Sequence, residues 1–113
     1  MSKRDEKIEQ YVAEAKKLGL SLSEDLITKV TIGLGPSIYK KDSETVSCSD
    51  PAELDRVKKN FIQKKLGLSI TDANMDAAIQ KVCETLGTSN RNKYRALFYA
   101  LLAKELGKES VYA

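Results

Sequence analysis

The chain has 113 residues, 42% of them hydrophobic and 31% charged, with a net charge of +3 at neutral pH. These proportions are typical of one ordinary globular domain and exclude a disordered or membrane-spanning chain. The pI near 8.8 is lower than the value above about 9 expected of a dedicated nucleic-acid-binding domain.

The N-terminal segment predicts an amphipathic helix over residues 3–18. Its charges alternate without the apolar core of a secretory signal, and no later apolar run reaches the ~20 residues that span a bilayer, so we expect a cytoplasmic protein without a membrane anchor. Gly19 is suited to end this helix, and Ser23 to cap a second one. The apolar stripe of the first helix holds Ile8, Tyr11, Val12, Ala15 and Leu18.

Residues 33–49 form the longest predicted connection, because two glycines and a proline end the second helix there. Loops of more than about 12 residues are often functional, although Ile38, Tyr39 and Val46 are equally suited to fixing this one on the core. A helical turn around residues 43–46 also fits. The candidate binding residues on this loop are Ser37, Tyr39, Lys40 and Lys41.

A third helix is predicted from Asp50 to Leu66. Asp50 is a suitable N-cap, Pro51 fits the first helical position, and Glu53 completes a capping box. Its apolar stripe holds Leu54, Val57, Phe61, Ile62 and Leu66. The remaining positions give it a basic outer surface, which we interpret as a solvated face.

Two further helices complete the prediction. One starts between Asp72 and Asn74 and ends at Leu86, and the last follows Ser89 or Asn90 and continues to residue 106. The last carries the richest apolar face and is predicted to be central. Since no segment alternates with a period of two, the expected fold is all-α: a compact single-domain bundle of about five helices over residues 1–113.

Cys48 and Cys83 lie far apart in the chain, without the spacing of a zinc site. We therefore expect neither a structural disulfide nor a bound metal. With no histidine in the chain, a Cys-His nucleophile is excluded. Phosphate-binding, dinucleotide-binding and zinc-protease motifs are missing too, so the sequence predicts no catalytic residues and no cofactor, and it does not favour an enzyme.

Residues 79–98 partly match a helix-turn-helix. Gly87 fits the turn, but Cys83 occupies a position usually taken by alanine. Thr88 and Lys93 occupy positions where the motif ordinarily has hydrophobic residues. The motif is therefore degenerate, and DNA reading is only an alternative hypothesis.

The turn before the last helix is a candidate anion site. Backbone N–H groups after Asn90 would face an anion, and Arg91 and Arg95, one turn apart, would supply paired guanidinium groups, with Asn92 beside them. The alternative is that Ser89 or Asn90 caps these N–H groups while the two arginines pair with surface carboxylates.

Six segments carry a family resemblance: GPSIY (35–39), SDPAELDRVKKNF (49–61), KKLGL (64–68), DAAI (76–79), SNRNKYRALFYALLAK (89–104) and GKESVY (107–112). Together they resemble a family of small bacterial proteins catalogued only as a domain of unknown function. The resemblance implies a compact helical protein of bacterial, cytoplasmic origin, and brings no established activity, ligand or catalytic residue. The family pattern implies a small residue such as glycine where Cys48 stands, so thiol chemistry there is not implied as a shared function.

From these features we expect a small helical binding or adaptor module that recognises an acidic protein or a phosphate-bearing ligand. The alternative is nucleic-acid binding through the degenerate helix-turn-helix and the basic face of helix 50–66. The expected state is a monomer or a weak homodimer.

Overall fold

The computed structural model describes residues 3–90 and 92–112, apart from the side chain of Asp42. These residues form six α-helices and three further helical segments of 3-10 or π type. In chain order they are α1 (Lys3–Lys17), α2 (Glu24–Leu34), η1 (Gly35–Tyr39), α3 (Lys41–Glu44), α4 (Pro51–Arg56), η2 (Val57–Lys65), α5 (Asp72–Leu86), α6 (Arg95–Glu105) and η3 (Glu109–Tyr112). Over this part of the chain there is no strand, only an isolated bridge between Thr45 and Tyr94. The predicted all-α class is confirmed.

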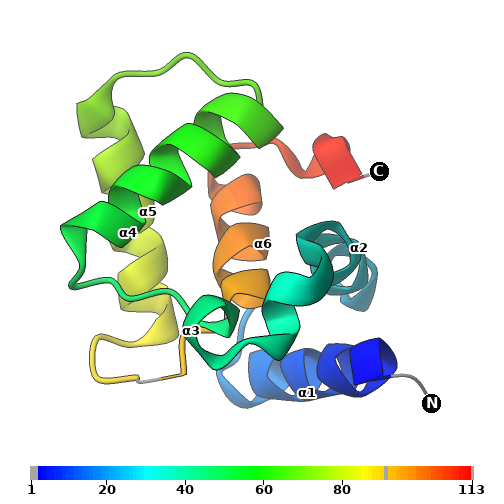
Figure 1. Ribbon diagram of the computed structural model, residues 1–113. Coiled ribbons are helices and arrows are strands. Elements are labelled where there is room, and N and C mark those ends of the chain that lie inside the picture. Colours follow the sequence, from blue (N-terminus) through cyan, green and yellow to red (C-terminus); the bar gives the residue numbers. More distant parts are fainter. Residues whose placement is uncertain (1–2, 91, 113) are drawn as a thin grey trace.

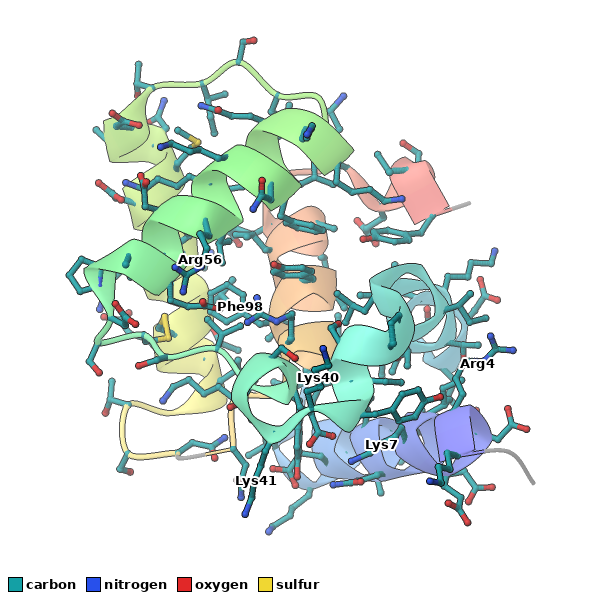
Figure 2. All side chains as sticks on the ribbon, in the orientation of Figure 1. Arg4, Lys7, Lys40, Lys41, Arg56 and Phe98 are labelled. Atoms are coloured by element: carbon teal, nitrogen blue, oxygen red, sulfur yellow. A yellow bond between two sulfur atoms is a disulfide. The ribbon has the colours of Figure 1, made fainter. Side chains whose placement is uncertain are left out.

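Helix α6 stands at the centre of the molecule (Figure 1), with α1 and α2 on one side and α4, η2 and α5 on the other. It packs most extensively against α2 and α5. Phe98, labelled in the middle of Figure 2, is fully buried. The other buried residues of α6 are Ala96, Leu97, Ala100, Leu102 and Ala103. The prediction that the last helix is central is therefore confirmed.

Side-chain caps fix the starts of three helices. Ser23 Oγ accepts a hydrogen bond from Leu26 N (3.1 Å) at α2, and Asp50 Oδ1 accepts one from Ala52 N (3.0 Å) at α4. Thr71 Oγ1 does the same for α5, which begins at Asp72, within the range predicted. Each cap satisfies a backbone N–H that has no partner inside the helix.

Residues 33–49 are largely helical rather than an open loop. They contain η1 and α3, and α3 begins two residues before the helical turn predicted at 43–46. Ile38 and Val46 are buried as anticipated, whereas Tyr39 is 47% exposed. The segment is also tied to α1, because Tyr11 Oη donates to Glu44 Oε2 (2.6 Å). Burial and this bond raise the pKa of the Tyr11 phenol well above its ordinary range.

The predicted third helix changes its winding after one and a half turns. It begins at Pro51 as predicted, but from Val57 to Lys65 it is a π-helix, η2. The bond from Leu66 N to Phe61 O (2.8 Å) spans five residues, as in a π-turn.

Helix α6 begins at Arg95, later than the predicted start after Ser89 or Asn90. Asn90 Nδ2 instead donates to Leu86 O (2.9 Å), so the turn closes the end of α5. Tyr94 is then held extended by its bridge to the loop before α4. These two constraints delay the helix by about one turn.

A disulfide joins Cys48 in the loop to Cys83 in α5, with Cα atoms 6.2 Å apart. The expectation of no structural disulfide was therefore wrong. Separation in the sequence, 35 residues here, does not limit separation in space once the fold brings two segments within the 4.4–6.8 Å typical of bridged Cα atoms. The described helices include none that is long and apolar enough to cross a membrane.

Candidate polar pocket

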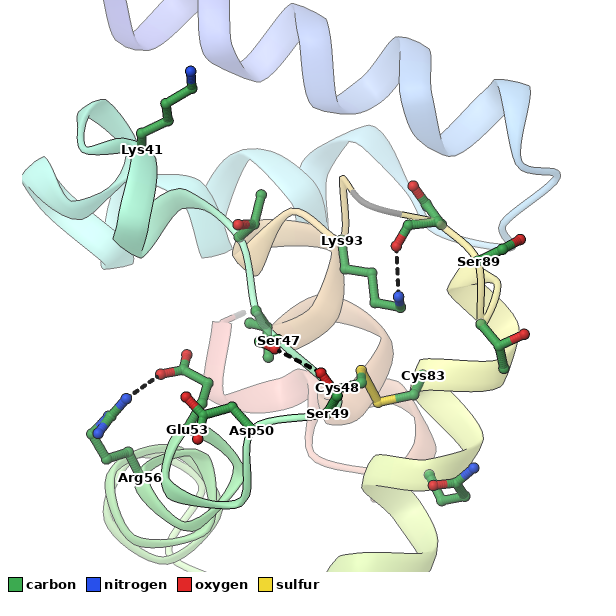
Figure 3. A pocket seen from close by; sticks show the side chains of 15 residues that line it. Lys41, Ser47, Cys48, Ser49, Asp50, Glu53, Arg56, Cys83, Ser89 and Lys93 are labelled. Carbon is green, nitrogen blue, oxygen red and sulfur yellow. Dashed lines mark hydrogen bonds and ion pairs between the residues drawn. A yellow bond between two sulfur atoms is a disulfide. The ribbon is translucent and has the colours of Figure 1, made fainter.

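An open pocket of about 910 Å³ lies where the segment before α4, the end of α5 and the turn before α6 meet (Figure 3). Most of its lining is polar. The first wall consists of Lys41, Thr45, Val46, Ser47, Cys48, Ser49, Asp50, Glu53 and Arg56. The opposite wall consists of Gln80, Cys83, Thr88, Ser89, Asn90 and Lys93. The disulfide joins the two walls.

Lys93 is the nearly buried cation of this pocket, with 8% of its surface exposed. Its Nζ donates to Asn90 O (2.6 Å), and its backbone O accepts from Val46 N (2.9 Å). An ammonium carries three N–H donors, and within the described part of the chain no other acceptor and no carboxylate pairs with this one. Two donors with a full charge are therefore available to a group entering the pocket.

The carboxylates of the pocket are already engaged. Glu53 accepts hydrogen bonds from both Arg95 and Arg56. Burial disfavours its ionisation, but the two arginines outweigh that effect and hold the pKa of Glu53 below its ordinary value of 4.5. Asp50 accepts from Ala52 N as the cap of α4. These acids consequently do little to offset the charge of Lys93 and of Lys41 at the pocket edge.

Arg95, a residue nominated for anion binding, lies inside the fold and does not line the pocket. Its Nε donates to Ser43 O (2.7 Å), one terminal nitrogen to Tyr99 Oη (3.0 Å), and the other to Glu53. Only 13% of its side chain is exposed. In this arrangement the guanidinium joins α6 to the loop and to α4, and an anion would have to displace these partners.

The other nominated residues of the turn are divided. Asn90 lines the pocket, Asn92 does not, and Arg91 lies outside the described residues. Asn90 Oδ1 accepts from Asn92 N (2.9 Å), so the amide of Asn90 occupies a backbone donor that was expected to face an anion. Asn90 thus satisfies one backbone N–H, as in the alternative weighed above, but it does not cap α6, whose N-cap Tyr94 makes no capping side-chain hydrogen bond.

Of the nominated loop residues, only Lys41 reaches the pocket. Figure 2 shows it pointing outward from α3. Ser37 bonds within the loop, its Oγ donating to Leu34 O (3.0 Å). Tyr39 faces a smaller hollow beside α1, and Lys40 lines neither. The two predicted surfaces thus meet in one pocket through Lys41 and Asn90.

Lys93 was missed as a site residue, although its position carried a signal. It was noted only as a charged residue at a helix corner that ordinarily takes an apolar one. A lysine at such a position is forced below the surface while its charge still requires partners. That conflict between burial and charge is the sequence feature that would have identified it.

The fold and the pocket define a small all-α domain with a polar, cation-bearing hollow. The family model described as "Protein of unknown function (DUF2853)" matches residues 10–110, and the chain belongs to this family. A comparison with curated proteins gives no significant match.

Proposed function

We propose that this protein is a small helical binding module whose polar pocket receives a carboxylate or phosphate group of an acidic or phosphorylated partner protein. The observation that supports this proposal is the environment of Lys93. This lysine is nearly buried, its ammonium makes one hydrogen bond, and no carboxylate among the described residues pairs with it. A buried charge is costly unless it is paired. An incoming anion would supply the missing partner.

The shape of the pocket favours a segment of a partner protein over a small metabolite. It is an open hollow of about 910 Å³, lined mostly by polar side chains with hydroxyl, amide and charged groups. Small-molecule sites are usually more enclosed and mostly apolar. The hydroxyls of Ser47, Ser49, Thr88 and Ser89 would donate to further oxygens of an anionic group.

Nucleic-acid binding through residues 79–98 is less well supported. In a helix-turn-helix the second helix presents a free face to the major groove. Here that helix is α6, which lies at the centre of the fold with six residues buried. Arg95, at its first position, is engaged internally.

The test is an amide NMR titration of the labelled protein with two peptides of one sequence, carrying either phosphoserine or serine at one position. Duplex DNA is titrated in parallel. We expect the phosphopeptide to shift the amide resonances of Asn90 and Lys93. Lys93→Met should weaken the affinity for the phosphopeptide by about tenfold or more, since a charge-assisted hydrogen bond contributes about 1.5–3 kcal/mol.

Lys64→Met is the matched control, because Lys64 is an exposed lysine far from the pocket lining. It should bind as the wild type does. Equal affinity of Lys93→Met and wild type would overturn the proposal, and shifts caused by DNA alone would favour the alternative. A cytoplasmic location, a bacterial origin and a monomeric or weakly dimeric state stay predictions.

A further inference from the structure

The disulfide between Cys48 and Cys83 lies in the lining of the pocket, and its two cysteines differ in exposure. Both cysteines line the hollow, but Cys48 is half-buried whereas Cys83 is 4% exposed. Thiol–disulfide exchange requires a thiolate to reach the sulfur that it attacks. Because Cys48 is the more exposed of the two residues, its Sγ is the sulfur that an attacking group in the pocket would reach first.

The backbone on each side of Cys48 is held without the disulfide. On one side, Val46 N donates to Lys93 O (2.9 Å). On the other, Asp50 caps α4. Between them, Ser47 and Ser49 bond only to each other and to Asp50 N, and among the described residues no hydrogen bond joins the 47–49 turn to α5. Among the described residues, the disulfide is thus the one covalent or hydrogen-bonded link between this turn and α5.

We propose that Cys48–Cys83 is an exchange-active disulfide, opened by a dithiol reductant that attacks Cys48, and that its opening releases the 47–49 turn from α5 while the helical fold persists. The turn forms part of one pocket wall. Reduction consequently remodels the pocket. The exchange reaction does not depend on the proposed anion binding; only the effect of reduction on that binding rests on the proposed function.

The exchange proceeds in two balanced steps. One thiolate of the dithiol attacks Cys48 Sγ, the Cys48–Cys83 bond breaks, and Cys83 leaves as a thiolate. The second thiolate of the reductant then attacks the reductant's other sulfur, which is bonded to Cys48 in the mixed disulfide. This closes the reductant's own disulfide and releases Cys48 as a thiolate. Two electrons pass to the cysteines, the dithiol becomes a disulfide, and the two released thiolates take up protons from water according to their pKa values.

Lys93 lines the same pocket as Cys83, on which a negative charge forms. Cys83 lies in the last turn of α5, where the helix dipole disfavours an anion. A lysine ammonium near a cysteine favours the thiolate, and Lys93 and the disulfide face the same pocket (Figure 3). The same lysine that would receive an anionic ligand thus also assists the departure of Cys83.

The inference also fits the setting proposed for the protein. In a reducing cytoplasm a disulfide is usually transient and redox-sensing or catalytic, rather than a permanent staple. A half-buried Cys48 and a turn with no described hydrogen bond to α5 are the properties that such a bond needs.

The first experiment measures reduction of the oxidised protein by dithiothreitol, in native buffer and in denaturing urea, without any binding ligand. We expect the native rate to lie within about a hundredfold of the rate in urea. If reduction required global unfolding, a stability of at least 5 kcal/mol would slow it by more than about a thousandfold, and such a rate would overturn the proposal. The reduced protein is also incubated with oxidised glutathione. If its two cysteines remain free thiols and do not form the disulfide, the proposal is overturned.

Two further measurements locate the reaction. A brief pulse of a monothiol followed by mass spectrometry should find the adduct on Cys48, and an adduct mainly on Cys83 would contradict the assigned direction. Lys93→Met should slow reduction about threefold, because the leaving thiolate becomes more basic, whereas Lys64→Met should not. Amide shifts on reduction should centre on residues 46–50 and on the end of α5, and loss of dispersion throughout the spectrum would count against a local release. Since no ligand is present, a failure here is distinct from a failure of the binding titration.

Discussion

At the residue scale, Arg95 connects the central helix α6 to α3, to the loop that follows it and to α4. The sequence nominated it as a ligand-binding arginine because it lies one helical turn after Arg91, so that the two would supply paired guanidinium groups. In the fold it donates four hydrogen bonds, to Ser43 O, Tyr99 Oη and Glu53, and at a longer distance to Thr45 O. A planar guanidinium with several fixed donors is better suited to this role than a lysine.

Replacing Arg95 by methionine should lower the free energy of unfolding by about 3 kcal/mol, because the partly buried Glu53 would lose one of its two charged partners and two carbonyls would lose donors. Arg56→Ala is the matched control, since Arg56 pairs with the same carboxylate but 60% of its side chain is exposed. It should cost less than about 1 kcal/mol. Urea denaturation measures the free energy of unfolding of both variants. Equal decreases would show that the burial of Arg95 does not make it more important for stability than Arg56.

The ion pairs of Glu53 should make the stability of the fold sensitive to acid. Its pKa in the folded state is below the ordinary 4.5 because Arg56 and Arg95 outweigh burial. A depressed pKa contributes stability that is present above the ordinary value and is lost as the pH falls through the folded value. The stability advantage of wild type over Glu53→Gln should therefore be constant above about pH 5 and shrink toward pH 2.5. Denaturation curves across this range test it, and a difference independent of pH would refute it.

At the element scale, the winding of η2 follows from the spacing of its apolar residues. Val57, Phe61, Ile62 and Leu66 are all buried. In an α-helix Val57 and Leu66 would lie about two and a half turns apart, and therefore on opposite faces. The wider π-turn, with about one extra residue, brings all four to one side. There Phe61 stacks on Tyr99 of α6, with ring centroids 4.0 Å apart.

This winding makes a packing prediction. Leu66→Ala should lower the free energy of unfolding by about 3 kcal/mol, because it removes a side chain that is 3% exposed and leaves a cavity. Lys64→Ala, at an exposed position of the same segment, should change it by less than about 0.5 kcal/mol. A nearly neutral Leu66→Ala would mean that Leu66 faces solvent, as regular α-helical winding from Val57 would require.

The elements were predictable where local signals fixed them. Asp50 followed by Pro51 marked the start of α4, since capping depends on neighbouring residues alone, and α5 starts within the predicted range from Asp72 to Asn74. The start of α6 was misplaced because the bridge from Tyr94 to Thr45, distant in the chain, overrides the local capping signal of Asn90. The stripe in η2 was recognised, but its spacing was interpreted with the α-helical period.

At the scale of the whole molecule, the hydrophobic pattern sufficed for the class and the central helix, because burial of apolar faces is what the pattern encodes. The pocket was not predictable as a unit. Lys41, Lys93 and the two cysteines come from four separate segments, and their meeting depends on how α3, α5 and α6 pack. The site therefore emerges from tertiary contacts, whereas its individual polar residues are visible in the chain.

The disulfide should stabilise the whole chain by about 3 kcal/mol, because it closes a 35-residue separation and restricts the unfolded ensemble. Urea unfolding of the oxidised protein and of the dithiothreitol-reduced protein measures the difference. The Cys48→Ser, Cys83→Ser double variant is the control: it should match the reduced protein and not respond to dithiothreitol.

This magnitude connects stability with the proposed exchange. Domains of this size have a free energy of unfolding of about 5–15 kcal/mol, so a loss of about 3 kcal/mol leaves the reduced chain folded. The Arg95 contacts and the bond between Val46 and Lys93 keep residues 43–46 in place after the sulfur–sulfur bond is opened, while the 47–49 turn is released. A reduced protein that unfolds in native buffer would show instead that the disulfide is a structural staple. A stability that is unchanged by reduction would show that the cross-link does not restrict the unfolded chain as its loop length requires.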